Sequence, residues 1–307
     1  MLSGHLEDGR VGSEPGHESG DSSERAAAAA LFTSQAYAAT NDDAKTRAAV
    51  DWLEAQSIHP FLRDVAARSL ARLALQSGES VLEVGCGTGV FLPGLAGAVG
   101  SEGRVVGLDH SAVFLEEARK RLADASLPGP VELVEGDAHH LPFADGTFDA
   151  AHCERVLMHV EDPEIAIREL QRVVRPGGRV VVAEVYPAGA RMDHPDPEAE
   201  QLISGALSSG IRNRSMGIAL RGLFVKTGFT EVDGEVVGFF EDELDQDEAE
   251  QWAGVARGLA TRGVLDPARA EAAIAAMEDR RATGQHCGLA IIFVVSGRVP
   301  GEPRDDG

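Results

Sequence analysis

Apolar and amphipathic stretches alternate regularly in the middle of the chain. Short apolar runs, typical of buried strands, cover residues 80–84, 104–109, 131–136, 148–152 and 178–185. Between them, apolar residues recur at helical spacing in 88–98, 111–124 and 161–175. Strands that alternate with helices form a mostly parallel sheet with helices on both faces. The pattern therefore predicts a doubly wound α/β fold.

A helix is predicted before this region, and glycines supply candidate stops. The residues at helical spacing are Leu62, Val65, Ala66, Ser69, Leu70 and Leu73. Gly78 offers a stop for this helix. The segment RPGG at 175–178 offers a stop for the helix at 161–175, since its glycines can adopt a left-handed turn.

After residue 186 the regular alternation breaks. Residues 187–214 predict a loop with a short helix near 198–207, followed by a helix near 216–227 and a strand near 230–240. The segment 247–284 is helical, with a second start at Asp266–Pro267 and an end at Gly284. The continuous apolar run LAIIFVVSG at 289–297 suits a buried strand.

These patterns predict one domain with two flexible ends. Residues 1–25 hold few apolar side chains and predict a disordered acidic tail, and 301–307 predict a flexible tail. The domain covers 26–300, and its segments 26–60 and 187–214 are expected to act as lids over a ligand crevice. Residues 247–284 are a helical insertion before the last strand.

The charge of the chain narrows the choice of partners. The net charge is −22, and residues 231–250 hold ten acids with no Lys or Arg. Such a surface repels phosphate backbones and anionic lipids, so we expect neither nucleic acid nor membrane as a partner. The simpler interpretation is that these acids solvate a surface. The more specific alternative is that these acids attract a cationic substrate.

Cysteine usage and the N-terminus point to the cytoplasm. The three cysteines, Cys86, Cys153 and Cys287, lie far apart and in no metal or redox spacing, which fits free thiols in a reducing compartment. We see no secretory signal and no apolar run of the length that a membrane helix needs. We therefore expect a cytoplasmic protein without a metal site.

The segment VLEVGCGTG, residues 81–89, is the strongest chemical signal. Its glycines, Gly85, Gly87 and Gly89, follow a predicted strand in the spacing G-x-G-x-G. A dinucleotide fingerprint needs G-x-G-x-x-G, whose third glycine would fall at Val90. The acid Glu83 is unfavourable beside a pyrophosphate but useful beside an ammonium group. This combination favours S-adenosylmethionine over NAD.

Two further carboxylates end the next strands. Asp109 ends the strand at 104–109, where it could accept hydrogen bonds from both hydroxyls of a ribose. Asp137 follows the third strand, beside the expected place of an adenine, and the backbone N–H of Ala138 could donate to the ring. All these strand ends meet at one edge of a parallel sheet, where such folds bind ligands.

Five motifs in order resemble class I S-adenosylmethionine-dependent methyltransferases, and among them the ubiquinone and menaquinone C-methyltransferase group. The motifs are LEVGCGTG, GLDHS, GDAHHLPFADGTFD, ERVLMHVEDP and LQRVVRPGGRVVVAE. The resemblance is strong over 78–186 and weaker in the flanks. It implies a seven-stranded sheet with an antiparallel last strand, which 289–297 would supply. It also implies S-adenosylmethionine as cofactor and S-adenosylhomocysteine as product.

The resemblance assigns roles to individual residues. The methionine end of the cofactor would be framed by Glu83, Gly85, Cys86, Gly87 and Gly89. Asp109 would hold the ribose with His110 alongside, and Asp137 and Ala138 would contact the adenine. Cys153 and Glu154 would line the floor near the sulfonium.

The acceptor is expected above the ends of the fourth and fifth strands. We consider His159 as a base or an orienting group, and Glu184 and Tyr186 as candidates on one face of the fifth strand. His152 is expected to face the adjoining helices. His139 and His140 are expected to pack in a loop rather than bind metal.

The leading interpretation is a methyltransferase that acts on a small molecule in natural-product or secondary metabolism. Two other classes stay open: a non-methylating enzyme on the same cofactor, such as a cyclase, and a non-catalytic protein that binds S-adenosylmethionine. An NAD-dependent oxidoreductase is disfavoured by Val90 and Glu83. We leave a homodimer open.

Overall fold

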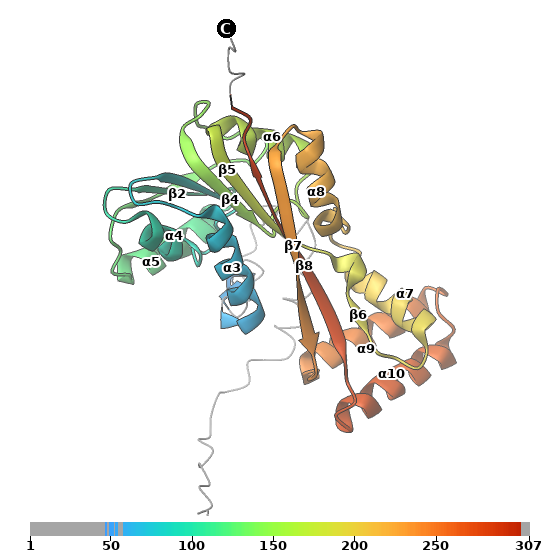
Figure 1. Ribbon diagram of the computed structural model, residues 1–307. Coiled ribbons are helices and arrows are strands. Elements are labelled where there is room, and N and C mark those ends of the chain that lie inside the picture. Colours follow the sequence, from blue (N-terminus) through green and yellow to red (C-terminus); the bar gives the residue numbers. More distant parts are fainter. Residues whose placement is uncertain (1–46, 48, 52, 55–57, 302–307) are drawn as a thin grey trace, which may run out of the picture.

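The computed structural model describes residues 47, 49–51, 53, 54 and 58–301 (Figure 1). The expected tail at 1–25 and nearly all of the expected lid at 26–60 lie outside these residues, as does the C-terminal tail apart from residue 301.

A single twisted sheet carries the fold. Its strand order is β3-β2-β1-β4-β5-β8-β6, and β7 pairs with β8. The strands are β1 (Ser80–Val84), β2 (Arg104–Asp109), β3 (Val131–Glu135), β4 (Phe148–Glu154), β5 (Val174–Val185), β6 (Arg191–Met192), β7 (Thr230–Glu241) and β8 (Gly288–Arg298). The pairs among β1 to β5 are parallel, and β8 runs antiparallel to β5, β6 and β7. The predicted α/β fold with an antiparallel last strand is confirmed, with the two-residue β6 as an addition.

Helices cover both faces of the sheet. The core of one face includes side chains from α3 (Pro60–Leu73), α4 (Leu92–Val99) and α5 (Ala112–Asp124). The core of the other face includes side chains from α6 (Pro163–Val173) and α8 (Met216–Lys226). These two separate cores explain why the central strands are apolar on both faces, as the continuous apolar runs indicated.

A third core belongs to a helical lobe beside the C-terminal end of the sheet (Figure 1). It joins α7 (Pro197–Leu207), α9 (Gln246–Thr261) and α10 (Pro267–Ala282). The predicted insertion at 247–284 is the α9–α10 pair, and Asp266 caps α10 as expected by accepting from the backbone N–H of Arg269. A short 3-10 helix, Pro187–Gly189, and β6 lead from β5 into this lobe.

Two predicted helix stops are wrong. Helix α3 ends at Leu73, since Ala74 adopts the left-handed conformation (φ 45°) four residues before Gly78. Helix α6 ends at Val173, and RPGG lies inside the bounds of β5 as an irregularity: Phe148 pairs with Val174, but Ala150 pairs with Arg179. Gly177 has the expected left-handed conformation, with a φ of 75°. It lies in the irregular part of β5, however, and not at the end of a helix.

The strand register places the ligand-facing ends together. Val84 at the end of β1 pairs with Leu108 of β2 and with Cys153 of β4. The loops that follow these three strands therefore leave the sheet at the same level. No helix among the described residues has the length and apolar character needed to cross a membrane.

Candidate active site

A cavity of about 1100 Å³ opens where these loops leave the sheet. One end is lined by the glycine loop and the residues after β2 and β3, and the other by α3, β7, α9 and β8. Ligand pockets typically measure about 300–1,000 Å³. The cavity therefore has room for a cofactor at one end and a second small molecule at the other.

The three glycines of the loop have positive φ angles and different neighbours. Gly85, Gly87 and Gly89 have φ angles of 73°, 52° and 77°. A side chain at Gly85 would overlap Val156, and one at Gly89 would lie 3.0 Å from Cβ of Ala118 on α5. At Gly87, among the described residues, a Cβ would meet only Leu53 Cδ1, at 3.8 Å.

Gly87 therefore leaves space at the cavity wall for a ligand to approach the backbone, while Gly89 serves close helix packing and does not line the cavity. Cys86 lines the cavity but is only 8% exposed. Burial raises the pKa of its thiol, so the thiol stays neutral and packs.

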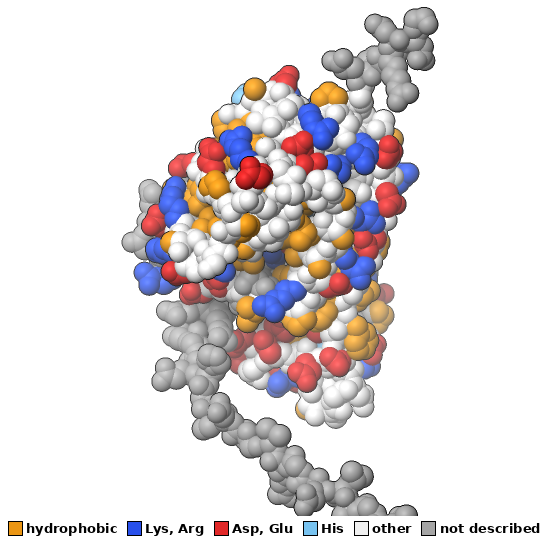
Figure 2. Space-filling view, turned by 60° about the vertical axis from the view of Figure 1, so that its left-hand side comes forward, with side chains coloured by type: hydrophobic (Ala, Val, Ile, Leu, Met, Phe, Trp, Pro, Cys, Tyr) orange, Lys and Arg blue, Asp and Glu red, His pale blue; other side chains and the backbone are white. Residues whose placement is uncertain are grey.

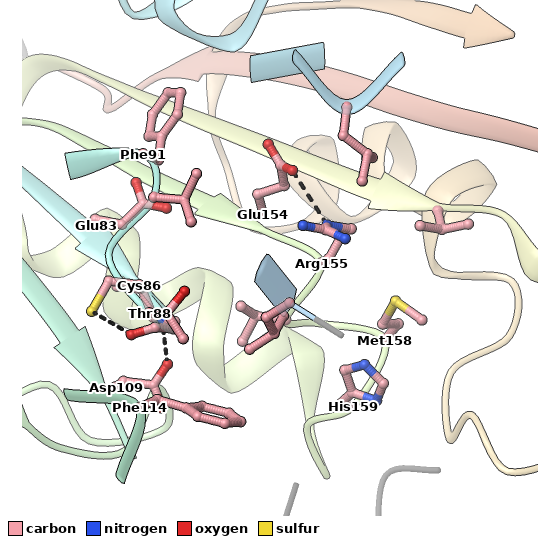
Figure 3. A pocket seen from close by; sticks show the side chains of 18 of the residues that line it. Glu83, Cys86, Thr88, Phe91, Asp109, Phe114, Glu154, Arg155, Met158 and His159 are labelled. Atoms are coloured by element: carbon pink, nitrogen blue, oxygen red, sulfur yellow. Dashed lines mark hydrogen bonds and ion pairs between the residues drawn. The ribbon is translucent and has the colours of Figure 1, made fainter. Parts of the chain in front are cut away.

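Asp109 lies at the end of β2 beside the glycine loop. It is 5% exposed, and its Oδ2 accepts from the N–H of Gly87 at 2.8 Å. Its Oδ1 accepts from the N–H of Ser111 at 2.9 Å and lies 3.4 Å from His110 Nδ1. Figure 3 shows Asp109 and the ring of Phe114 side by side on the cavity wall. The carboxylate is thus held in place by two backbone donors and keeps lone pairs for a ribose.

Asp137 belongs to a hydrogen-bonded chain that fixes the loop after β3. Its Oδ1 accepts from the His139 N–H at 2.9 Å and lies 2.7 Å from His139 Nδ1. His139 Nε2 accepts from the N–H of Asp162 at 3.1 Å. Because Nε2 accepts, Nδ1 carries the proton and donates to Asp137. Asp137 and Ala138 both line the cavity, and His139 has the loop role that the sequence predicts.

Glu83 is paired with a residue whose importance the sequence reading missed. His152 Nδ1 lies 2.7 Å from Glu83 Oε2, and His152 is completely buried. The ring of Phe91 stacks on the imidazole with centroids 4.4 Å apart. Burial raises the pKa of Glu83; burial lowers the pKa of His152, but attraction to Glu83 outweighs this and leaves it raised. His152 thus holds the carboxylate that lines the cavity at the end of β1.

We expect His152→Leu to weaken both folding and S-adenosylhomocysteine binding. The substitution leaves Glu83 buried without its partner, which costs about 1–3 kcal/mol of unfolding free energy. Denaturant unfolding and calorimetric titration measure the two effects. His140→Leu, in an exposed loop position, is the matched control. Unchanged values for both quantities would mean that Glu83 needs no support from His152.

The chain turns into the cavity directly after β4. Arg155 has a φ of 56°, a conformation that costs a non-glycine residue about 1–2 kcal/mol. Its N–H donates to Ala183 O at 2.8 Å, and its Nε lies 3.3 Å from Glu154 Oε1. Figure 3 shows this pair at the cavity wall. Glu154 lines the cavity as expected, but Cys153 does not: its side chain is completely buried in the core, because alternation along β4 turns it away.

His159 lies on the cavity wall beside Met158 (Figure 3). Residues 156–159 form a turn closed by a hydrogen bond from His159 N to Val156 O, at 2.9 Å, rather than the predicted helical turn. Asp162 then caps α6, with Pro163 at its first position, as predicted. Burial, with smaller contributions from Arg155 and His110, lowers the pKa of His159 to about 4. The imidazole is therefore neutral at physiological pH.

The other two catalytic candidates do not line the cavity. Glu184 is completely buried, and its Oε1 accepts from the N–H groups of Val156 (2.9 Å) and Leu157 (2.5 Å). Tyr186 packs against Phe293 with ring centroids 6.1 Å apart. Neither side chain therefore reaches the cavity in which a catalytic role was predicted for it. Glu184 supports the turn that carries His159.

The far end of the cavity is mostly apolar. Phe61 and Phe239 lie with ring centroids 5.2 Å apart, and His59 meets Phe239 edge-on at 4.9 Å. The apolar residues here are Ile58, Phe61, Leu62, Ala66, Val185, Phe239, Ala290 and Ile292. Two carboxylates, Glu241 and Glu248, complete this end. The sequence signal for part of this wall was the alternation of Val237, Phe239 and Glu241 on one face of a strand.

The predicted lid at 187–214 takes no part in the cavity wall. Its helix α7 packs into the helical lobe instead. Asn213 nevertheless supports the wall from behind, since its Nδ2 donates to the carbonyls of Leu157 and Val160, both at 2.8 Å. Within the described residues, no group of three or more His, Cys, Asp or Glu side chains could hold a metal ion.

The residues at the glycine-loop end fit S-adenosylmethionine. The open side of Gly87 accommodates a close ligand, and the donor set at this end contains carboxylates where a pyrophosphate would need N–H groups and cations. Glu83 would meet the ammonium, Asp109 the ribose and Asp137 the adenine amine. Glu154 also lines the cavity.

The comparisons with known proteins agree with this geometry. The profile of a family described as "Methyltransferase domain" matches residues 82–182. An uncharacterized 37.1 kDa protein in transposon TN4556 of Streptomyces fradiae is 39% identical over 181 residues, which cover 59% of this chain and 52% of that protein. The ubiquinone/menaquinone biosynthesis C-methyltransferase UbiE of Klebsiella pneumoniae is 32% identical over 174 residues, which cover 52% of this chain and 69% of UbiE.

Among solved structures, the YcgJ protein of Bacillus subtilis aligns with a TM-score of 0.54 at 19% identity, over 78% of this chain and 100% of that one, which shows the fold. The chain spans about half the length of the Streptomyces protein and of several demethylmenaquinone methyltransferases. The ordered motifs, the strand order and the match along UbiE lead to one conclusion: this chain belongs to the class I S-adenosylmethionine-dependent methyltransferases.

Proposed function

We propose that this protein transfers a methyl group from S-adenosylmethionine to a small-molecule acceptor. The observation that carries the proposal is the continuous cavity, which runs from the glycine loop past His159 to an apolar wall. When bound, the cofactor supplies a methyl group on an electron-poor sulfur, which a nucleophile takes in an in-line displacement. The protein's contribution is approach geometry and the exclusion of water.

The described residues divide this work. Glu83, Asp109 and Asp137 would bind the cofactor, and the rings of Phe61 and Phe239 would hold the acceptor. The neutral imidazole of His159 would take the proton that a hydroxyl, amine or activated carbon loses as its bond to the methyl forms. The relatives' names include quinone methyltransferases. An acceptor with an apolar or aromatic body fits the wall here as well, and we propose secondary metabolism as its setting.

The test is turnover with a panel of small aromatic and apolar acceptors. We expect S-adenosylhomocysteine to form together with a product heavier by one methyl group, as detected by mass spectrometry. Rearranged product without methyl gain would favour the cyclase alternative. Tight binding of S-adenosylmethionine without any conversion across the panel would favour the non-catalytic one.

Asp109→Ala should weaken S-adenosylhomocysteine binding by about 1.5–3 kcal/mol, the range of charge-assisted hydrogen bonds. The carboxylate lines the cavity and is already oriented by the N–H groups of Gly87 and Ser111. Calorimetry measures the affinity, and thermal unfolding checks that the loop remains folded. Glu116→Ala, on the exposed side of α5, is the control. Affinity equal to that of the wild type would remove Asp109 from the binding site.

A further inference from the structure

The acidic segment 231–250 divides into two parts with different surroundings. On β7 the acids pair with arginines: Glu235 with Arg72 at 2.8 Å, and Asp233 with the same arginine at 2.9 Å. Glu231 pairs with Arg298 at 2.9 Å. Toward the helical lobe, among the described residues, neither Glu241 nor Glu248 pairs with an arginine or lysine, although both line the cavity.

The whole cavity has an excess of negative charge. Among the described residues, its lining contains seven carboxylates and three guanidinium groups. Arg121 contacts Glu54, which is not among the lining residues, and Arg155 contacts Glu154, which is one of the seven. The surface around this region is also acidic: in Figure 2, Asp and Glu side chains gather on the lower part of the face, level with α9 and α10 in Figure 1. Such a field favours a cationic ligand.

The surroundings of Glu241 and Glu248 disfavour two unpaired negative charges. Burial, together with the nearby carboxylates of Glu241 and Asp245, raises the pKa of Glu248 to about 7. Burial also raises the pKa of Glu241, with a contribution from Asp245. Glu248 has one structural task, since its Oε2 accepts from the N–H of Asp245 in the capping box of α9, at 3.3 Å. That bond leaves its other oxygen available.

A buried imidazole lies beside Glu241. His286 is 4% exposed, and neither of its ring nitrogens has a hydrogen-bond partner among the described residues. Its Nε2 faces Glu241, 3.8 Å from Oε2. Buried polar groups are rarely left unpaired. His286 is not among the cavity-lining residues, so it bears on a ligand through Glu241, the carboxylate that it faces.

We propose that this end of the cavity binds a protonated amine of the acceptor through Glu241 and Glu248. An ammonium group has three donors, which matches two carboxylates with free oxygens. The rings of Phe61 and Phe239 stand on the same wall, where they pack against an apolar body or the face of a cation. The inference rests on the proposed function, because it assigns this end to the acceptor.

The test compares probes that differ only in charge. Phenethylamine and tryptamine are titrated into protein saturated with S-adenosylhomocysteine, beside phenethyl alcohol, tryptophol, phenylacetate and indole-acetate. We expect the amines to bind at least about tenfold more tightly than the alcohols, and the carboxylates to bind most weakly. Equal affinity across the three charges, or no binding of either amine, would overturn the inference.

Two variants assign the effect to the two carboxylates. Glu241→Gln and Glu248→Gln should each reduce the preference for amine over alcohol about tenfold while leaving S-adenosylhomocysteine affinity unchanged. Glutamine at 248 preserves the capping box. Glu243→Gln, on the same segment but outside the cavity lining, should leave the preference intact. A preference unaffected by both cavity variants contradicts the assignment, whereas failure of the wild type to bind S-adenosylhomocysteine contradicts the proposed function itself.

Discussion

Replacing His159 by alanine should lower turnover by about 10²–10⁴-fold, the usual contribution of a positioned general base. The imidazole lines the cavity that holds both proposed ends, and burial keeps it neutral with a pKa of about 4. Cofactor affinity should stay nearly unchanged, because the cofactor contacts lie on the loops after β1, β2 and β3. Initial rates and calorimetry on the same preparations separate the two quantities.

The pH profile gives this prediction a second readout. A base must be neutral, so its contribution is lost as the pH falls through its pKa. For His159 that loss occurs near pH 4, and this group should cause no fall in rate between about pH 5 and 8. His140→Ala is the matched control. A loss smaller than tenfold in His159→Ala would point to packing or orientation, and an acidic limb near the ordinary histidine pKa would contradict the buried, neutral state.

Glu184→Ala should lower the free energy of unfolding by about 2–6 kcal/mol, because two buried N–H groups lose their acceptor at about 1–3 kcal/mol each. The turn at 156–159 would lose its support, so activity should fall as well. Glu184→Gln should be far milder, because the amide retains a carbonyl acceptor of the same shape. Denaturant unfolding of both variants measures the difference.

The pKa of Glu184 sets how the stability of the wild type and of Glu184→Gln should differ with pH. Burial raises this pKa to about 8, against the opposing effect of three backbone N–H groups. Between the unfolded value and about 8 the folded protein binds more protons than the unfolded one, so stability falls as pH rises. The wild type should therefore lose stability relative to Glu184→Gln over that window. A wild type that gains stability over the same range would show that the carboxylate is ionised and favoured there.

The sequence predicted the sheet, and the meeting of the glycine loop with the carboxylates beside it, for a physical reason. Buried strands flanked by helices leave continuous apolar runs, and the loop with Gly85, Gly87 and Gly89 must sit where the backbone bends sharply. Carboxylates that end β1 and β2, such as Glu83 and Asp109, then converge because parallel strands share one edge. These signals are local in the sequence, so they can be recognised before the fold is known.

The errors came from contacts between distant segments. Glu184 lies on the expected strand, but only the fold shows that it is satisfied by N–H groups of Val156 and Leu157. His152 gained its role from Glu83, 69 positions away. The acceptor end draws on α3, β7 and α9, and the expected lid at 187–214 packs elsewhere, because the helical lobe offers its apolar faces a core of their own.

Calorimetric titration of the wild-type protein with S-adenosylhomocysteine tests most directly whether the cavity beside Gly87 and Asp109 is a site for S-adenosylmethionine. We expect saturable binding at one site per chain, with no measurable heat from NAD under the same conditions. Absence of S-adenosylhomocysteine binding, or binding of NAD that S-adenosylhomocysteine displaces, would contradict it.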